Sequence, residues 1–448
     1  MLLSQWIGFK RLLQDETYPT PWLFNQLEKR LLKEKEFKTK RLLSSLEHQN
    51  IPENLSPVSV EELYGDTVYA SVSKIENFYK CQYKYFLMYG LGLKERDKFE
   101  LSPAATGDFY HETLDQFFKE LIKRELVLSQ MTQADIYDLT QAVLMNVLGE
   151  DKFAILNTTN RMNYIKYQLE KTIHRVGWSL KRQSERSNMD VIQTEVLFGQ
   201  ALQEISLDSL DFELSQQKKL KVRGKIDRID KMKIEEDVYL SVIDYKSSKH
   251  NFDFVDAYYG LALQMVTYLN VALENAVTLV GEKAKAAGAF YMHVQNPVLT
   301  GSEKITDETI DEEMLKAFKY EGILVKEERL LESLDKTIDL GIKSSVYPYE
   351  QLKKGTMKSS RFVSEEELDW LIDNNQTKFK EAGEAIFKGS TKLNPAYKGQ
   401  TRVACEFCPF RSVCQFDVML KENNYHRIEP LDKEEIMKCQ MEEQKNDE

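Results

Sequence analysis

"GKIDRIDKM" at residues 224–232 and "SVIDYKSS" at 241–248 decide the fold class, because each has the composition of a strand that ends in charged residues. Asp244 and Lys246 are two positions apart, so on a strand both side chains leave the same face. Asp227 and Asp230 are three positions apart and point to opposite faces. Only one of these two acids is therefore expected to join Asp244.

Further segments with strand and helix character surround this pair. Residues 190–199, 219–232, 238–248 and 286–294 are rich in β-branched and aromatic residues and short enough for strands. The spacing of apolar residues predicts one helix after Gly107, and a second helix is predicted over 256–276. The order helix, three strands, helix, strand predicts an α/β fold with a mixed central sheet flanked by helices.

The composition indicates a soluble protein without a basic coat. The 61 Lys and Arg against 72 Asp and Glu give a net charge of −11, which argues against a surface built throughout for nucleic acid. A local basic groove and clustered metal-binding carboxylates are compatible with it. No apolar run approaches the ~20 residues that span a bilayer, and the opening "MLLSQWIGFKRLLQDE" lacks the apolar core of a signal peptide. We expect a cytoplasmic protein with no membrane partner.

The acids and the lysine suggest a divalent-metal site. Glu195 interrupts a strand that is otherwise apolar, and it would reach Asp227 and Asp244 from a third strand. Mg²⁺ takes hard oxygen ligands and completes its shell with waters and substrate phosphate. Lys246 would then orient an attacking water or neutralise charge on phosphoryl oxygens. The spacing alone fits an ordinary surface ion pair between Asp244 and Lys246 equally well.

The order of these motifs resembles the RecB-type branch of the PD-(D/E)xK nuclease superfamily. G-x-x-D at 224–227 is followed by D-x-K at 244–246 and by a predicted helix that carries Gln264 and Tyr268 in a Q-x-x-x-Y pattern. Upstream, "GDFYHETL" at 107–114 matches the G-x-x-x-H-x-x-L element of that branch. The resemblance implies a restriction-endonuclease-like nuclease core.

The resemblance also implies a role for each matching residue. The acids and His111 would hold the metal, and Lys246 would be the catalytic lysine. Gln264 and Tyr268, one helical turn apart, would face the site and position DNA or the lysine. Taken alone, a histidine beside an apolar stripe also fits a core residue, and the Gln–Tyr pair fits ordinary helix packing. The implied set is Lys246, Asp244, Asp227, Glu195, Gln264, Tyr268 and His111.

Three of the five cysteines lie within ten residues, in "CEFCPFRSVC" at 405–414. A zinc or iron–sulfur site built from thiolates usually has four ligands, so the fourth would be Cys81 or Cys439. Cys439 lies in a hydrophilic tail, whereas Cys81 lies in the aromatic, apolar segment 71–93. Burial favours Cys81, and a metal shared with the C-terminal cysteines would close a very long loop. Four thiolates suit zinc and iron–sulfur equally.

Over roughly residues 65–430 the chain resembles the C-terminal nuclease region of the AddB family, the B subunits of AddAB helicase–nucleases. This resemblance implies a heterodimer with an AddA-type subunit, Mg²⁺-dependent cleavage of single-stranded DNA with 5′→3′ polarity, and double-strand break repair by homologous recombination. It also implies a [4Fe–4S] cluster. Two rival functions are a stand-alone iron–sulfur exonuclease of the CRISPR-adaptation type and a non-cleaving, DNA-binding structural subunit. The implied cluster ligands are Cys81, Cys405, Cys408 and Cys414.

The chain is expected to divide into three parts. Residues 1–66 are predicted to be a helical remnant of a preceding helicase-like domain with a linker, and 67–430 to be the nuclease domain. Within that domain 298–400 is predicted to form a helical insertion or cap, and 431–448 is predicted to be a flexible tail. No G-x-x-x-x-G-K-[ST] loop occurs in the 448 residues, so the chain is not expected to hydrolyse ATP.

Overall fold

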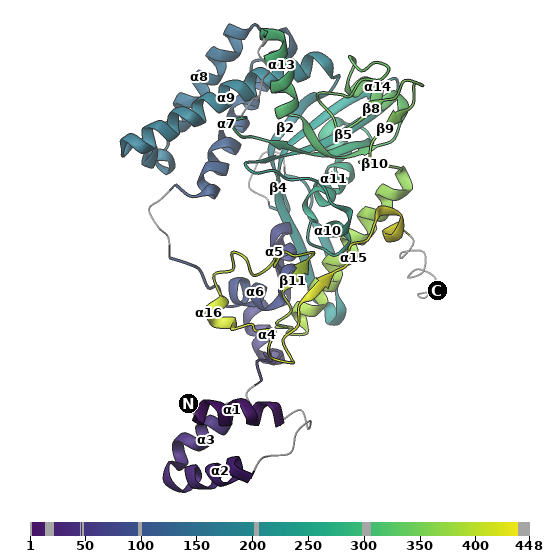
Figure 1. Ribbon diagram of the computed structural model, residues 1–448. Coiled ribbons are helices and arrows are strands. Elements are labelled where there is room, and N and C mark those ends of the chain that lie inside the picture. The colour runs from purple at the N-terminus through teal and green to yellow at the C-terminus, as the bar shows by residue number, and fades with distance from the viewer. Residues whose placement is uncertain are drawn as a thin grey trace.

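Strand β4 (Lys219–Ile234) organises the central sheet. The computed structural model describes residues 2–13, 22–44, 46, 49–96, 101–200, 206–297 and 306–437. Within them eight strands form one mixed sheet around β4 (Figure 1). The other seven are β1 (Thr67–Ser71), β2 (Asp190–Phe198), β3 (Leu210–Glu213), β5 (Asp237–Lys246), β6 (Lys285–His293), β7 (Tyr320–Val325) and β10 (Phe362–Val363).

The two halves of β4 have different neighbours. Its N-terminal half pairs with β1 in parallel and with β3 antiparallel, while its C-terminal half pairs antiparallel with β2 and β5. The sheet continues through a parallel β5–β6 pair and an antiparallel β6–β7 pair, and ends at β10. The strands predicted from the sequence agree with β2, β4, β5 and β6 within a few residues, so the mixed sheet is confirmed.

Helices cover both sides of this sheet. Long helices α7, α8 and α9 gather on one side, and α10, α11 and α15 lie on the other (Figure 1). Helix α7 begins where Ser102 caps it and Pro103 occupies its first turn, and its apolar stripe is buried. The helices that matter below are α5 (Val72–Lys80), α6 (Gln82–Tyr85), α7 (Pro103–Lys123), α8 (Gln133–Leu148), α9 (Asn160–Arg186), α10 (Phe254–Tyr258), α11 (Gln264–Glu274), α13 (Asp307–Ala317), α15 (Glu365–Phe387) and α16 (Arg411–Cys414).

The single helix predicted over 256–276 is two helices, α10 and α11. Gly260 separates them with a φ of +77°, a left-handed conformation that favours glycine. A Cβ at this position would lie 2.5 Å from the ring of Tyr79 on α5. The break therefore serves close packing against α5, and it places Gln264 at the first turn of α11.

The segment 298–400 is not a helical insertion, because its described part supplies β7 and β10 to the central sheet. Strand β7 has only a short apolar run between charged neighbours, which explains why the sequence did not reveal it. Its pairing with β6 depends on Gly322, where a Cβ would lie 2.1 Å from the carbonyl oxygen of Ala289. The same segment contributes α15, whose residues pack on α10 and α11.

The segments that precede and follow the central sheet in sequence both contact the part of the molecule that contains it. Helices α1 (Leu2–Leu13), α2 (Trp22–Glu34) and α3 (Glu36–Ser44) lie apart from it, but Asn50 donates from Nδ2 to the carbonyl of Cys414 at 3.0 Å (Figure 1). In the predicted flexible tail, Ile436 is fully buried and Lys433 lies 2.6 Å from Glu367. Residues 431–437 are therefore packed rather than flexible. Cys439 lies outside the described residues.

Asp230, the acid expected to point away from Asp227, is held in a buried ion pair. Arg228 donates from Nε to Asp230 at 2.6 Å and also bonds the hydroxyl of Tyr320 at 3.0 Å. Its guanidinium lies 4.8 Å from the centre of the Phe118 ring. Removing one partner of such a buried pair costs about 3–5 kcal/mol, because the other charge is left uncompensated. This pair belongs to the core and leaves Asp227 as the β4 acid that faces the site.

Candidate active site

The candidate site lies where the ladder between β4 and β5 ends. Paired residues run as far as Arg228 and Ile243. Beyond this pair, the backbone N–H of Tyr245 donates a hydrogen bond to the side-chain carboxylate of Asp227 at 2.9 Å, and not to a backbone carbonyl of β4. Asp227 and Asp244 are 5% and 1% exposed. The end of the ladder therefore holds two buried acids next to each other.

Two further elements bring His111 and Glu195 to these acids. His111 on α7 places Nδ1 3.2 Å from a carboxylate oxygen of Asp227 and 3.8 Å from one of Glu195 on β2. Ligand atoms of the three residues all lie within 4.8 Å of one another. We call His111, Glu195, Asp227 and Asp244 the acid cluster. The structure thus brings together residues that are up to 133 positions apart.

Glu195 has a backbone conformation that is rare for its residue type. Its φ is +51°, in the left-handed region, although it lies within strand β2. A conformation of this kind costs on the order of 1–3 kcal/mol and persists only where the surroundings enforce it. Its Oε1 is buried without a hydrogen bond, while Lys225 contacts the other oxygen. The strain directs a carboxylate toward Asp227.

Gln264 connects Asp244, Lys246 and Tyr268. Lys246 places Nζ 2.5 Å from Asp244 Oδ2 and donates to Gln264 Oε1 at 3.2 Å. Gln264 Nε2 in turn donates to Asp244 Oδ1 at 2.7 Å and to the Tyr268 hydroxyl at 3.1 Å. All four predicted residues thus form one hydrogen-bonded group, in which Gln264 bonds both the carboxylate and the ammonium.

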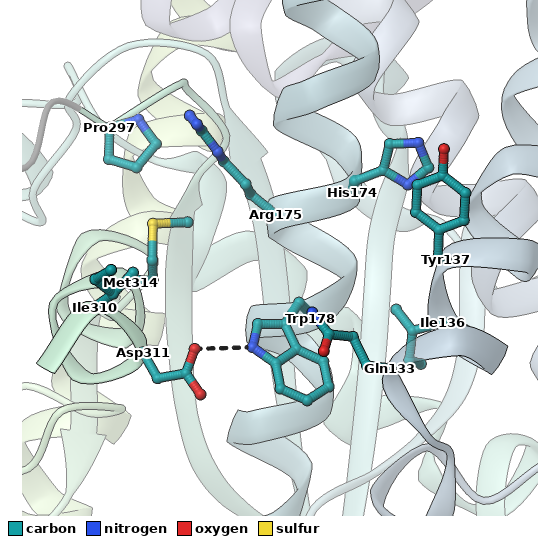
Figure 2. Close-up of a pocket in the computed structure, with 10 residues that line it drawn as sticks. All are labelled: Gln133, Ile136, Tyr137, His174, Arg175, Trp178, Pro297, Ile310, Asp311 and Met314. Atoms are coloured by element: carbon teal, nitrogen blue, oxygen red, sulfur yellow. Dashed lines mark hydrogen bonds between the residues drawn. The ribbon is translucent and has the colours of Figure 1, made fainter. Parts of the chain in front are cut away.

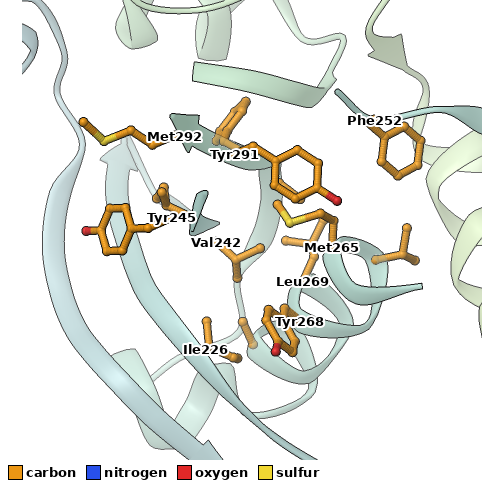
Figure 3. Packing of buried hydrophobic residues seen from close by; sticks show 14 of the residues in the cluster. Ile226, Val242, Tyr245, Phe252, Met265, Tyr268, Leu269, Tyr291 and Met292 are labelled. Atoms are coloured by element: carbon orange, nitrogen blue, oxygen red, sulfur yellow. The ribbon is translucent and has the colours of Figure 1, made fainter. Parts of the chain in front are cut away.

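Apolar packing beneath this group keeps α11 against the sheet. Figure 3 shows Met265, Leu269 and Tyr268 of α11 facing Val242 of β5 and Ile226 of β4. These five side chains are buried and belong to one hydrophobic core. Close packing of this kind leaves little freedom for Gln264, which lies one residue before Met265.

Burial and charge shift the pKa values of two members of the acid cluster. Burial alone would lower the pKa of His111, but its contacts with Asp227 and Glu195 raise the value to about 10. Burial raises the pKa of Asp244 to about 7, and the neighbouring charge of Asp227 adds to that increase. The attraction of Lys246 opposes it only in part. Negative charge is therefore crowded at this point of the protein.

The acid cluster fits a divalent metal ion. Its donors are carboxylate oxygens with one imidazole, the ligands that Mg²⁺ and Mn²⁺ accept. Glu195 Oε1 is buried and has no hydrogen-bond partner, so it has a free lone pair for a ligand, while Asp244 Oδ2 contacts the Lys246 ammonium. A double positive charge would also relieve the crowding that raises the pKa of Asp244.

The four predicted thiol ligands line a second site, which we call the thiol pocket: Cys81, Cys405, Cys408 and Cys414. Cys81 lies at the junction of α5 and α6 and is buried, and all four thiols are free. Burial raises the pKa of Cys81 to about 11, and the nearby Cys405 and Cys408 add to this effect. Four soft donors around one apolar pocket fit a thiolate-bound metal centre, whose positive charge would favour the thiolates.

A separate pocket between α8, α9 and α13 contains none of the predicted site residues (Figure 2). Several of its polar groups already have hydrogen-bond partners. Trp178 donates from Nε1 to Asp311 at 3.1 Å, and His174 Nδ1 lies 2.6 Å from the hydroxyl of Thr140. The pKa values of His111 and Asp244 in the acid cluster are strongly raised, whereas in this pocket burial only lowers the pKa of His174.

Comparison with known proteins gives the family. The family model described as the PD-(D/E)XK nuclease superfamily matches residues 69–415. The chain belongs to the PD-(D/E)XK nuclease superfamily. This match includes every member of the acid cluster and all four cysteines of the thiol pocket. The fold class predicted from the sequence is confirmed by it.

The resemblance of this PD-(D/E)XK nuclease to helicase–nuclease B subunits is also confirmed. It is 53% identical over 403 residues to the B subunit of the ATP-dependent helicase/deoxyribonuclease of Enterococcus faecalis, a match that covers 89% of this chain and 33% of that protein. It is 42% identical over 447 residues to the protein of the same name from Latilactobacillus sakei, covering 97% of this chain and 38% of that protein. The chain spans about a third of the length of these curated relatives.

Among the described residues, no helix is both long and apolar enough to cross a membrane.

Lys225 is a residue of the candidate site that the sequence analysis missed. It lies two positions before Asp227 on β4, so the two side chains leave the same face, and it contacts Glu195. The sequence did contain this signal, because the strand period alone places a cation beside the first acid. The conformation of Glu195, by contrast, has no sequence signal.

We predict that Asp244→Asn flattens the pH dependence of stability of the metal-free nuclease. The folded-state pKa of Asp244, about 7, lies above its ordinary value of 3.8. The folded state therefore binds more protons than the unfolded state between these values, and the free energy of unfolding falls as pH rises through that window. The loss amounts to about 4 kcal/mol at pH 8.

Urea unfolding in EDTA at about pH 5 and pH 8 measures this difference. Asp244→Asn should be more stable than the wild type at the higher pH, and Asp237→Asn, at the half-buried start of the same strand, serves as the matched control. An Asp244→Asn protein that loses as much stability as the wild type between the two pH values would contradict the assignment.

Proposed function

We propose that this chain is a divalent-metal-dependent deoxyribonuclease that hydrolyses phosphodiester bonds in single-stranded DNA. The observation that carries the proposal is the convergence of three buried acids, His111 and Lys246 at one end of the β4–β5 ladder. The word deoxyribonuclease in the names of the matched proteins supports the same chemistry. Mg²⁺ is the proposed ion because carboxylate oxygens dominate the donor set.

Each residue of the site has a distinct task in this proposal. The acid cluster would hold Mg²⁺, which when bound supplies Lewis-acid stabilisation of the phosphoryl oxygens and an activated water. Lys246 would orient the attacking water and neutralise charge that builds on the phosphate. Gln264 keeps Lys246 and Asp244 in their mutual positions. Tyr268 supports Gln264 and would contact DNA from the same helix.

The proposed partner is an AddA-type helicase–nuclease subunit that forms a heterodimer with the protein and feeds it unwound DNA. This part of the proposal rests on the helicase/deoxyribonuclease names of the relatives and on the resemblance to the AddB family. By the same resemblance the enzyme would cut the strand with 5′→3′ polarity during double-strand break repair by homologous recombination, in the cytoplasm.

We expect Lys246→Ala and Asp244→Ala to reduce cleavage of single-stranded DNA in Mg²⁺ by about 10²–10⁴-fold, because each removes a group that acts on the reacting phosphate. Binding of the same DNA should persist in both variants, since the surrounding surface is unchanged. Gel assays of cleavage and of mobility shift measure the two properties on one preparation.

Lys285→Ala provides the matched control for this experiment. Lys285 also forms an ion pair with an aspartate of β5, Asp237, at 2.8 Å, but it lies at the opposite end of the strand. This variant should cleave like the wild type. Equal cleavage by the wild type, Lys246→Ala and Asp244→Ala would refute the active-site assignment.

We also propose that the thiol pocket holds a [4Fe–4S] cluster. Its support is the placement of Cys81 beside three cysteines more than 320 positions away, in a pocket otherwise lined largely by apolar side chains. Such a centre would tie α6 to the C-terminal segment around α16. Zinc suits four thiolates as well, so measured metal content distinguishes the two.

We predict that Cys81→Ser loses iron as completely as Cys408→Ser does, because a serine oxygen is a poor ligand for a soft metal centre. Elemental analysis and sulfide assay of anaerobically purified protein provide the measurement. Cys439→Ser is the control and should keep the wild-type iron content. Full iron in Cys81→Ser, or zinc in place of iron in the wild type, would overturn this proposal.

A further inference from the structure

Helix α11 begins without a capping side chain of its own. The residue at its N-cap position is Leu263, which offers no side-chain hydrogen bond. The first N–H groups of a helix have no partner within the helix and need one from elsewhere. Here Glu76 of α5 supplies it, because its Oε1 accepts the N–H of Leu263 at 2.9 Å and that of Gln264 at 3.1 Å.

We propose that Glu76 is a positioning residue of the nuclease site. Gln264 is held at its backbone by Glu76, while its side chain bridges Asp244 and Lys246. A shift of the first turn of α11 would therefore move the amide that hydrogen-bonds both the acid and the lysine. The catalytic part of this inference rests on the proposed nuclease function, whereas the capping contact stands on its own.

Helix α5 is firmly placed, so Glu76 can act as a fixed point. Tyr79 donates its hydroxyl to the carbonyl of Lys378 on α15 at 2.7 Å, and its ring packs directly against Gly260. The helix ends at Cys81, which belongs to the thiol pocket. One helix of nine residues thus connects the thiol pocket to the first turn of α11.

The length of the Glu76 side chain matters more than its charge in this role. Gln at position 76 retains an oxygen at the same reach and can accept the same two N–H groups, although it loses the attraction between a carboxylate and a helix N-terminus. Asp retains the charge but is one methylene shorter. The pair Glu76→Gln and Glu76→Asp therefore separates positioning by hydrogen bonds from a direct electrostatic role.

The first experiment is amide hydrogen exchange on the full chain without metal. In Glu76→Asp the peptide that contains Leu263 and Gln264 should exchange faster than in the wild type, and in Glu76→Gln it should stay close to the wild type. Glu62→Asp is the matched control, because it makes the same substitution at an exposed glutamate. Unchanged exchange at this peptide in Glu76→Asp would overturn the capping role, as would equal acceleration in Glu62→Asp.

The second experiment is steady-state cleavage of single-stranded DNA. Glu76→Asp should lower kcat by about ten- to a hundredfold at nearly unchanged KM, because misplaced catalytic groups affect the reaction more than substrate binding. Glu76→Gln should stay within a few-fold of the wild type. In a Gln264→Ala background, Glu76→Asp should cause no further loss, since the two residues act through one another.

A Glu76→Gln protein that is less active than Glu76→Asp would overturn the inference, because charge and not reach would then be required. Additive losses in the Gln264→Ala background would overturn it as well. Failure of the proposed function itself is recognised separately, by normal cleavage in Asp244→Ala, and it leaves the exchange experiment as the test of the capping contact.

Discussion

Repulsion between two buried carboxylates, Asp227 and Asp244, is the constraint on which the rest of the site depends. Neither acid can be exposed to water without breaking up the sheet, since both lie in the central strands β4 and β5. Burial and mutual repulsion raise the pKa of Asp244 to about 7. The protein tolerates this cost because the positive charges of His111, Lys225 and Lys246 surround the pair.

The surrounding structure can be understood as a frame that holds these charges together. Strand β4 is long enough to carry Asp227 toward the site and Asp230 into the core, where Arg228 neutralises it. Helix α7 supplies a histidine from one side of the sheet and α11 supplies Gln264 from the other. A site of this kind would trade stability for function, because a bound divalent ion would offset the repulsion between its carboxylates.

Much of this frame could be predicted from residue spacing. The period of two along a strand placed Asp244 beside Lys246 and separated Asp227 from Asp230, and β-branched runs located β2, β4, β5 and β6. Long-range geometry could not be predicted in this way. The left-handed conformation of Glu195, the separation of α10 from α11 at Gly260 and the pairing of β7 all depend on tertiary contacts that leave no local pattern.

The start of helix α11 could not be predicted from the sequence either, because its capping contact is also long-range. A sequence pattern for a helix start looks for a polar residue just before the helix, and Leu263 gives no such signal. The partner of that helix start, Glu76, is 187 positions away. Contacts of this length are found only when the chain is folded, and here one of them reaches the centre of the site.

Anomalous scattering at the manganese edge, measured on a crystal of the protein soaked with Mn²⁺, tests most directly whether the acid cluster binds a divalent metal. We expect a strong peak within bonding distance of Asp227 and Asp244, accompanied by movement of Lys225 away from Glu195. A fully soaked crystal with no peak at the acid cluster, and with the lysines still in contact with the carboxylates, would contradict this expectation.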